Sequence, residues 1–194
     1  MSEHGQGLLD HLAHAVSARP PRRHPAKEPG ERAAVCLVVR PDGHLLFIRR
    51  SEREGDPWSG HMAFPGGRME VEDGSTRRTA ARETMEEVGF DPEVGVYLGA
   101  LDELESPPAV QRRRLVITPH VWLLPGRPDL QPNEEVASVH WFGLPRLLAG
   151  EGRGTFSYEW RGRAVELPVV RLDGTDIWGI TLRVVDDLLA RLQV

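Results

Sequence analysis

The chain has 194 residues and a formal net charge of −5, and 40% of its residues are hydrophobic. This length suits one domain with its own core and short appendages. The negative charge argues against a general affinity for nucleic-acid polymers, although a local group of arginines can still receive phosphates. No apolar run approaches the roughly 20 residues that a membrane span needs. We therefore expect one catalytic unit without a membrane segment, acting on a small anionic substrate.

The N-terminus and the cysteine content both bear on location. The first residues lack the basic and then apolar arrangement of a secretory signal. The single cysteine, Cys36, cannot form an intramolecular disulfide. It lies in the apolar run of residues 33–39, which predicts a buried and unreactive thiol. Together these features predict a cytoplasmic protein.

Residues 1–30 are predicted to form an N-terminal helix and a linker, followed by the catalytic domain in residues 31–194. Leucines at helical spacing indicate a short amphipathic helix in residues 7–17, and residues 18–30 are rich in Pro and Arg. The basic cluster at residues 22–24 is expected to be solvated and flexible. A homodimer that uses this N-terminal segment is a further expectation.

The domain is expected to begin with a β-hairpin. The apolar run 32–39 is typical of a buried strand, residues 41–43 form a Pro-Asp-Gly turn, and residues 44–49 are the returning strand. After a polar loop, the short apolar stretch 62–64 meets Pro65-Gly66-Gly67, and we expect no regular strand or helix to continue through it. This part of the chain therefore predicts a functional loop.

A helix is predicted for residues 76–88. Ser75 is a suitable N-cap, and Gly89 stands where a left-handed residue ends a helix. Further downstream, periodicity predicts strands at 94–101, 114–124 and 136–142, a helical turn at 144–149, a hairpin over 155–170 that turns at Arg161-Gly162, and a helix at 182–192. The pattern is a mixture of α and β elements.

Three carboxylates gather on the predicted 76–88 helix. Glu83, Glu86 and Glu87 are spaced i, i+3 and i+4, which places them on one helix face. Like charges at this spacing repel, and a hard divalent cation between them, Mg²⁺ or Mn²⁺, would explain the arrangement. A solvated acidic face balanced by neighbouring arginines such as Arg82 explains it equally well.

The preceding glycines favour the metal interpretation. Gly66 and Gly67 can bring the backbone close to a phosphate or present N–H groups to an oxyanion, and Pro65 stiffens the approach. Mg²⁺ retains waters and completes its coordination with substrate phosphate oxygens. The loop and the helix together therefore predict metal-dependent hydrolysis of a phosphate compound.

Residues 64–67 and 82–90 together resemble the Nudix box. The second stretch matches the pattern R-E-hydrophobic-x-E-E-x-G-hydrophobic, except that Thr84 stands at a hydrophobic position. The interval between the glycines and the helix arginine is one residue longer than in the commonest form of the box. Glu72 or Asp73 takes the place of the outer glutamate of the box.

The resemblance implies a fold and a set of roles. The fold class is α/β (α+β), as an α/β/α sandwich with a mixed β-sheet. Glu86 and Glu87 would be principal metal ligands, Glu83 a further ligand or a water-orienting group, Arg82 an ion-pair partner of the glutamates, and Gly67 the residue that shapes the loop. The implied reaction is attack of a metal-activated water on a diphosphate linkage. A Nudix-fold binding module without catalysis is the alternative from another class.

Three stretches, one leading into the box and two outside it, resemble the coenzyme A pyrophosphatase branch of this superfamily. Residues 60–67 are similar to its G-Q-V-A-F-P-G-G signature, with His61 in place of Gln, and residues 177–181 are similar to its I-W-G-x-T segment. Residues 114–121 are similar to its R-V-T-P-x-V strand. The implied substrate is coenzyme A or acyl-CoA, cleaved to 3′,5′-ADP and (acyl-)4′-phosphopantetheine. Alternatives are ADP-ribose, dinucleotides and damaged nucleotides.

The remaining candidates lie outside the box. Arg49, Arg50 and Arg114 are candidates for clamping substrate phosphates, and surface ion pairs are the other interpretation of them. Glu135 is a candidate general base or a residue of a solvated turn before a strand. Trp178 either stacks on a base or packs in the core. No His or Cys spacing suggests a zinc site.

Overall fold

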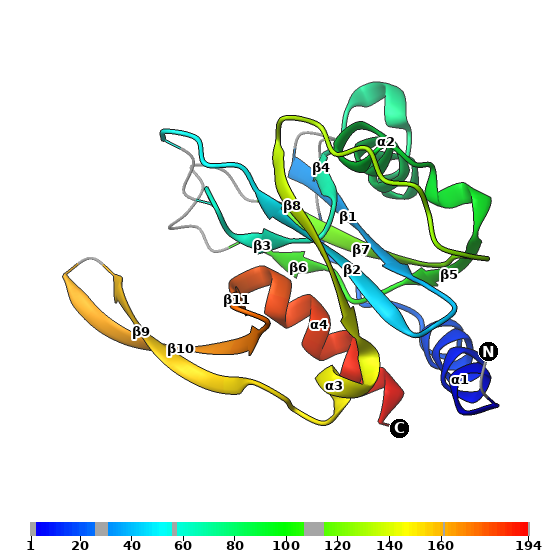
Figure 1. Ribbon diagram of the computed structural model, residues 1–194. Coiled ribbons are helices and arrows are strands. Elements are labelled where there is room, and N and C mark those ends of the chain that lie inside the picture. Colours follow the sequence, from blue (N-terminus) through cyan, green and yellow to red (C-terminus); the bar gives the residue numbers. More distant parts are fainter. Residues whose placement is uncertain (1–2, 26–30, 56–57, 107–114, 161, 194) are drawn as a thin grey trace.

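The computed structural model describes residues 3–25, 31–55, 58–106, 115–160 and 162–193 (Figure 1). An eight-stranded mixed sheet lies at the centre, with strands in the order β3-β2-β1-β7-β5. Three further strands join this path, with β4 paired to β1, β6 to β7, and β8 to β2. A separate three-stranded sheet has the order β11-β10-β9.

The element bounds follow the predicted pattern closely. The strands of the central sheet are β1 (Arg32–Val39), β2 (His44–Arg50), β3 (Met62–Ala63), β4 (Gly66–Arg68), β5 (Val96–Ala100), β6 (Leu104–Glu105), β7 (Val116–Leu123) and β8 (Val136–Gly143). The second sheet contains β9 (Arg153–Trp160), β10 (Arg163–Leu172) and β11 (Thr175–Trp178). The helices are α1 (Glu3–Ala18), α2 (Thr76–Val88), α3 (Leu144–Leu148) and α4 (Gly179–Leu192), with short 3₁₀ turns η2 (Val71–Asp73) and η3 (Pro92–Val94).

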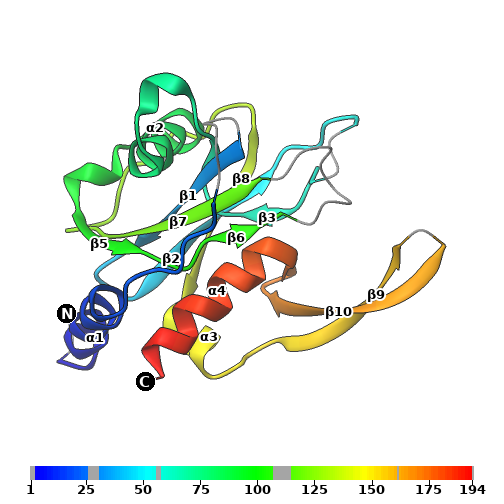
Figure 2. The same ribbon diagram turned by 180° about the vertical axis from the view of Figure 1, so that it is seen from behind.

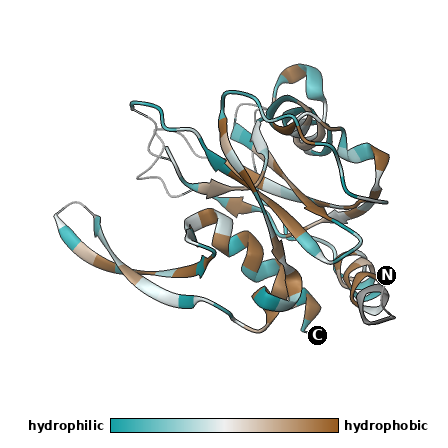
Figure 3. Ribbon diagram, in the orientation of Figure 1, coloured by the Kyte–Doolittle hydropathy of each residue, from teal (hydrophilic) through white to brown (hydrophobic). Residues whose placement is uncertain are grey.

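The continuous apolar sequence of β1 reflects burial on both faces of the sheet. Successive side chains of a strand alternate between faces. Leu37 and Val39 join the core cluster that contains α1 and α4, whereas Cys36 and Val38 join the cluster that contains α2. The α/β/α sandwich is therefore confirmed, with α2 on one side of the sheet and α1 and α4 on the other (Figures 1 and 2). Figure 3 shows the hydrophobic residues concentrated in these layers.

The ends of α2 are as predicted. The Ser75 side chain accepts a hydrogen bond from the Arg78 N–H at the N-terminus. Gly89 has φ 77° and donates its N–H to the Met85 carbonyl at the C-terminus. Both contacts satisfy backbone groups that the helix itself leaves unpaired. The Cys36 thiol is buried as predicted, and burial raises its pKa well above the usual range.

The glycine segment differs from the prediction. Pro65 does interrupt the chain, but Gly66 and Gly67 pair with β1 as strand β4, opposite Val35 and Ala34. A Cβ on Gly66 would lie 2.3 Å from the Ala34 carbonyl oxygen, so only glycine allows the two backbones to approach this closely. The prediction of an irregular loop through the glycines is therefore wrong, because their lack of side chains permits strand pairing.

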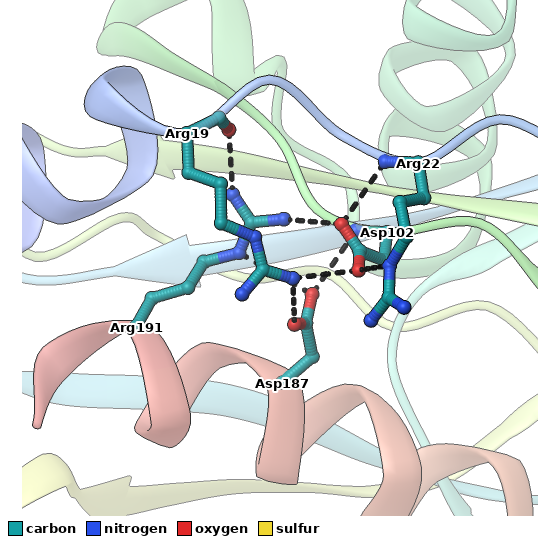
Figure 4. A network of polar contacts seen from close by, with 5 residues as sticks. All are labelled: Arg19, Arg22, Asp102, Asp187 and Arg191. Carbon is teal, nitrogen blue, oxygen red and sulfur yellow. Dashed lines mark hydrogen bonds and ion pairs between the residues drawn. The ribbon is translucent and has the colours of Figure 1, made fainter. Parts of the chain in front are cut away.

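The N-terminal segment is held on the domain by buried acidic residues. Asp102 accepts hydrogen bonds from Arg19 at 2.6 Å, from the Arg22 side chain at 2.6 Å and from Arg191 at 2.7 Å, and its own N–H donates to Asp187 at 3.0 Å (Figure 4). These residues come from the end of α1, the following segment, β5–β6 and α4. The network joins both ends of the chain.

The neighbouring Glu103 holds the next part of the same segment. It accepts bonds from the Arg23 side chain at 3.0 Å, the His24 N–H at 2.5 Å, Arg32 at 3.1 Å and the Thr118 hydroxyl at 3.0 Å. The side chains of Arg22 and Arg23 are solvated as predicted, but the expected flexibility is contradicted, because two buried carboxylates bind residues 22–24. The boundary at residue 30 stays a prediction. No helix in the described residues is both long and apolar enough to cross a membrane.

Candidate active site

The site is built where α2 packs against β4. The Gly66 N–H donates to Glu87 Oε2 at 2.8 Å, and Glu87 is almost completely buried. A Cβ on Gly67 would lie 2.3 Å from Glu83 Oε1, so the backbone of β4 lies directly against this carboxylate. The two glycines thus place Glu83 and Glu87 against the strand, one helical turn apart.

Glu86 has a different environment. At about 100° per residue, Glu86 and Glu87 are separated by about 100° around the helix axis, on either side of Glu83. The Glu86 side chain is 53% exposed and accepts a hydrogen bond from Arg82 at 3.0 Å. Among the residues that the structure describes, no three acidic or histidine or cysteine side chains form a group able to hold a metal ion. A cation at Glu83 and Glu87 would therefore take its remaining ligands from water or substrate oxygens, as Mg²⁺ commonly does.

Arg82 connects the helix to the turn that precedes it. Its guanidinium donates to Asp73 at 2.9 and 3.1 Å and to the Arg68 carbonyl at 3.1 Å, and it pairs with Glu83 at 3.0 Å. Asp73 is buried and also accepts from the Thr79 hydroxyl at 2.9 Å. Arg82, more than any other neighbour, lowers the pKa of Asp73 to about 2.

This geometry bears on the two candidates for the outer acidic residue of the box. Asp73 is oriented toward Arg82 by these contacts, whereas Glu72 is exposed. Arg82 therefore has a partner on each side, Asp73 from the turn and the glutamates from its own helix. Its guanidinium thus contacts carboxylates of both the turn and the helix.

The electrostatics of the helix face indicate a shortage of positive charge. Burial, more than any other cause, raises the pKa of Glu87 to about 8; the Gly66 N–H opposes this, and the charges of Glu83 and Glu135 add to it. Burial likewise raises the pKa of Glu83 above its usual value, against the attraction of Arg82. Buried carboxylates with too few cationic neighbours, presenting hard oxygen donors, are the chemistry that suits a hard divalent cation.

Glu135 lies at the rim of this site. Its charge raises the pKa of both Glu83 and Glu87, so it lies near them. The backbone around it is fixed, because the Ser51 N–H donates to the Glu135 carbonyl at 2.8 Å. Its carboxylate is 42% exposed and accepts from Arg53 at 3.1 Å. The downstream segment before β8 thus reaches the glutamates of α2.

The predicted phosphate-binding arginines lie at different places. Arg50 ends β2, and its charge lowers the pKa of Glu87, which places it near the carboxylates. Arg49 is exposed and donates through Nε to the Gly60 carbonyl at 3.2 Å, at the edge of the sheet. Arg114 lies outside the described residues. The structure therefore brings Arg50 to the site and Arg49 to the segment that leads into it.

Sequence reasoning did not find two contacts beside the site. The His61 ring lies 4.7 Å from the Trp178 ring, and the Thr181 hydroxyl donates to the Met62 carbonyl at 3.0 Å. These contacts join the start of β3 to the end of β11 and the first turn of α4. The only sequence signal for them is the resemblance of both stretches to one branch of one superfamily.

The profile of the NUDIX domain matches residues 29–158, which include β1, the glycine strand, α2 and β8. The chain belongs to the NUDIX domain family. A sequence relative that covers most of both chains is the uncharacterized Nudix hydrolase NudL of Pectobacterium atrosepticum, 29% identical over 96% of this chain and 95% of the relative. NudL of Yersinia enterocolitica is 30% identical over 82% of this chain and 80% of the relative.

A shorter but stronger match is to the uncharacterized protein C14C4.10c of Schizosaccharomyces pombe. It is 42% identical over 60% of this chain and spans 36% of that protein. This chain therefore corresponds to about a third of the length of the yeast relative. The match supports membership of the family, and the activity of the longer protein is not transferred to this chain.

Solved structures support the NUDIX fold. The MutT protein of Methanosarcina mazei Go1 superposes with a TM-score of 0.53 at 17% identity, covering 87% of this chain and 96% of that one. A MutT/nudix family protein of Enterococcus faecalis gives a TM-score of 0.51 at 19% identity, covering 97% of this chain and 67% of that one. At these identities the likeness concerns the fold alone. Together with the NUDIX hydrolase relatives, it identifies the chain as a pyrophosphohydrolase of a family that uses divalent metal ions.

Proposed function

We propose that the chain hydrolyses the diphosphate linkage of coenzyme A or acyl-CoA to 3′,5′-ADP and (acyl-)4′-phosphopantetheine. The main support for this substrate is the contact between two stretches that lie far apart in the sequence. Residues 60–67 and 177–181 both resemble the coenzyme A branch, and the His61–Trp178 and Met62–Thr181 contacts bring them together beside the glycine strand. A shared substrate-binding role explains why both stretches carry the pattern.

The proposed metal is Mg²⁺ or Mn²⁺. Glu83 and Glu87 would hold it from the buried side, and Glu86 would contribute from the exposed side of α2. When bound, the ion polarises a phosphoryl oxygen and activates water for attack. The excess of buried negative charge and the exclusively oxygen donors support this choice.

The residues around the metal ligands have separable roles in the proposal. A water oxygen forms a bond to one phosphorus atom, the bond from that phosphorus to the bridging oxygen breaks, and the second phosphate leaves with that oxygen. Glu135, facing the site from its rim, accepts the proton of the attacking water. The negative charge of the phosphate oxygens is balanced by three arginines, Arg49, Arg50 and Arg114. Arg82 is a positioning residue, because its guanidinium holds the carboxylates.

The setting of the enzyme is also proposed. We place it in the cytoplasm, where its buried single cysteine needs no oxidising compartment. The partner is a small nucleoside-diphosphate compound, with no nucleic-acid polymer and no membrane. A homodimer is part of the proposal, although most of the arginines of the N-terminal segment are already engaged within one chain.

Product identification tests this proposal. The full chain is incubated with Mg²⁺ or Mn²⁺ and equal concentrations of coenzyme A, ADP-ribose and a diadenosine polyphosphate, and products are identified by mass spectrometry. We expect coenzyme A to be cleaved fastest, with release of 3′,5′-ADP and 4′-phosphopantetheine. Faster cleavage of ADP-ribose or of the dinucleotide would refute the substrate assignment. Absence of any hydrolysis would instead favour a binding module.

A further inference from the structure

Four aromatic rings gather at the edge of the central sheet, outside both main core layers. The Trp178 ring lies 4.7 Å from His61, 5.2 Å from Phe156 and 5.4 Å from Tyr158. Phe156 and Tyr158 are 6.3 Å apart. These four residues, here called the aromatic cluster, come from the segment before β3, from β9 and from the end of β11. The β9–β10 hairpin, which extends away from the main body, contributes two of the rings (Figures 1 and 2).

The aromatic cluster differs from the core in its exposure. Core rings such as Phe47 and Trp122 have 0% exposure. All four rings of the aromatic cluster are only partly buried. A group that served packing alone would gain more by covering these faces, since each aromatic side chain carries a large apolar area. Part of this aromatic surface is therefore accessible to a ligand ring.

The aromatic cluster is continuous with the active site. Gly66, whose N–H contacts Glu87, is the fifth residue after His61, and five extended residues span at most about 17 Å. The Arg49 guanidinium lies at the His61 end of this stretch, bonded to the carbonyl of Gly60 next to His61. Arg49 is exposed and adds positive charge beside the rings. A ligand with a ring at one end and a diphosphate at the other can reach both ends of this stretch.

We propose that the aromatic cluster binds the nucleobase of the substrate, with Trp178 as the principal stacking residue and Arg49 contacting the adjoining phosphate. This inference rests on the proposed function, and it specifies which end of a nucleoside diphosphate compound lies against the β9–β11 sheet. Base–aromatic stacking tolerates different bases because every base has a π-face. The aromatic cluster therefore selects for a nucleotide end and leaves discrimination of the other end to other residues.

Ligand pairs with and without a base test the inference. Binding of ADP and of inorganic pyrophosphate to the full chain is measured by isothermal titration calorimetry in the presence of Mg²⁺. For Trp178→Leu we expect the Kd of ADP to rise roughly 10-fold, as loss of one stacking partner predicts, with the Kd of pyrophosphate unchanged. Trp178→Phe keeps an aromatic face and should restore most of the ADP affinity.

Trp141→Leu is the matched control. Trp141 is another partly buried tryptophan, on β8, where Arg40 covers its ring, so its loss should leave both Kd values unchanged. Equal weakening of ADP and pyrophosphate in Trp178→Leu, or no weakening of either, would overturn the inference. Should thermal denaturation show that Trp178→Leu is unfolded, Tyr158→Leu carries the same expectation and is judged by the same two outcomes.

The test of base binding by the aromatic cluster can be distinguished from the test of the coenzyme A substrate. The product profile of the unmodified chain decides whether coenzyme A is the substrate. The ratio of ADP to pyrophosphate affinity in the variants decides whether the rings bind a base, and it requires no hydrolysis. If the chain prefers ADP-ribose and Trp178→Leu weakens binding of ADP but not of pyrophosphate, coenzyme A is refuted as the substrate. Base binding by the aromatic cluster is then still supported.

Discussion

Two buried pairs of carboxylates in this chain have opposite environments. Asp102 and Glu103, between β5 and β6, accept hydrogen bonds from several arginines of the segment after α1, of β1 and of α4, and Figure 4 shows those of Asp102. Glu83 and Glu87, on α2, have Arg82 and the Gly66 N–H as direct partners, with the charge of Arg50 nearby. Asp102, Glu103 and Glu87 are buried and Glu83 is partly buried, but only the first pair has several cationic partners.

The pKa values express this difference. For Asp102 and Glu103, burial is the largest single influence and raises the pKa, yet the bonds and charges of their basic neighbours outweigh it, so both pKa values are lowered. For Glu83 and Glu87, burial prevails and both pKa values are raised. Asp102 and Glu103 have enough basic partners within the chain to serve a structural role. Glu83 and Glu87 have too few, which is typical of carboxylates whose cation comes from a ligand.

The largest expected effect is on activity, in Glu87→Gln. The amide preserves the size of the side chain but removes the negative charge that a bound cation needs. We expect kcat/KM to fall by about 10³-fold, equivalent to about 4 kcal/mol of activation free energy. The free energy of unfolding without metal should be nearly unchanged or higher, because burial already disfavours the charged form of Glu87. Steady-state kinetics and urea denaturation measure the two effects.

Glu72→Gln is the control for that variant. Glu72 belongs to the same motif but is exposed, so its charge should have less than a threefold effect on kcat/KM. Added Mg²⁺ should raise the melting temperature of the unmodified chain and of Glu72→Gln but not that of Glu87→Gln. A Glu87→Gln variant with unchanged activity would show that the carboxylate does not bind the catalytic metal.

The next largest effect is on stability, in Asp102→Asn. The change removes the closer anionic partner of the Arg191 guanidinium, at 2.7 Å, and leaves this 1% exposed side chain with Asp187 at 3.4 Å. Removal of one member of a buried ion pair costs about 3 kcal/mol or more of unfolding free energy. Because the pKa of Asp102 is lowered in the folded state, its stabilisation is complete above the unfolded pKa and is lost as the pH falls through the folded value. The difference between variant and unmodified chain should therefore shrink below about pH 4.

Asp176→Asn provides the comparison for this variant. Asp176 pairs with Arg171 at 3.7 Å with both side chains about half exposed, so we expect a loss below about 1 kcal/mol. Urea denaturation at pH 7 and at about pH 3 measures both variants. kcat should be nearly unchanged in both. A loss of activity in Asp102→Asn while the fold is intact would mean that the N-terminal network also shapes the active site.

The sequence predicted the active-site pair far better than the structural pair. Glu83 and Glu87 lie in one helix, whose limits Ser75 and Gly89 mark through local capping chemistry. Asp102 finds its partners about 80 and 90 residues away along the chain, and no local pattern encodes contacts at that separation. The helix was therefore predicted to the residue, while the attachment of residues 19–25 was missed.

The glycines fall between these two cases. Gly66 and Gly67 were recognised as part of the site, but their pairing with β1 depends on a partner strand roughly thirty residues upstream. In the sequence, β1 is a continuous apolar run, which predicts burial on both faces. It does not indicate which elements cover each face. The ion pair of Glu86 with Arg82 follows from their i,i+4 spacing in the helix, whereas the bond of Arg82 to Asp73 depends on how the preceding turn folds back.

The smallest effect expected is that of Gly67→Ala, which probes how tightly the glycine strand holds the carboxylates. The new methyl group would lie 2.3 Å from Glu83 Oε1, at the end of a flexible side chain that can move away, so the loss of stability should be about 1 kcal/mol. Displacement of Glu83 should still lower kcat/KM roughly 10-fold, because catalysis is sensitive to shifts of about 1 Å. Gly126→Ala, where a Cβ meets nothing within 4 Å, should change neither quantity. If Gly67→Ala retains full activity, the Glu83 carboxylate needs no fixed position against β4, and the metal site depends on Glu87 and its bond to Gly66 instead.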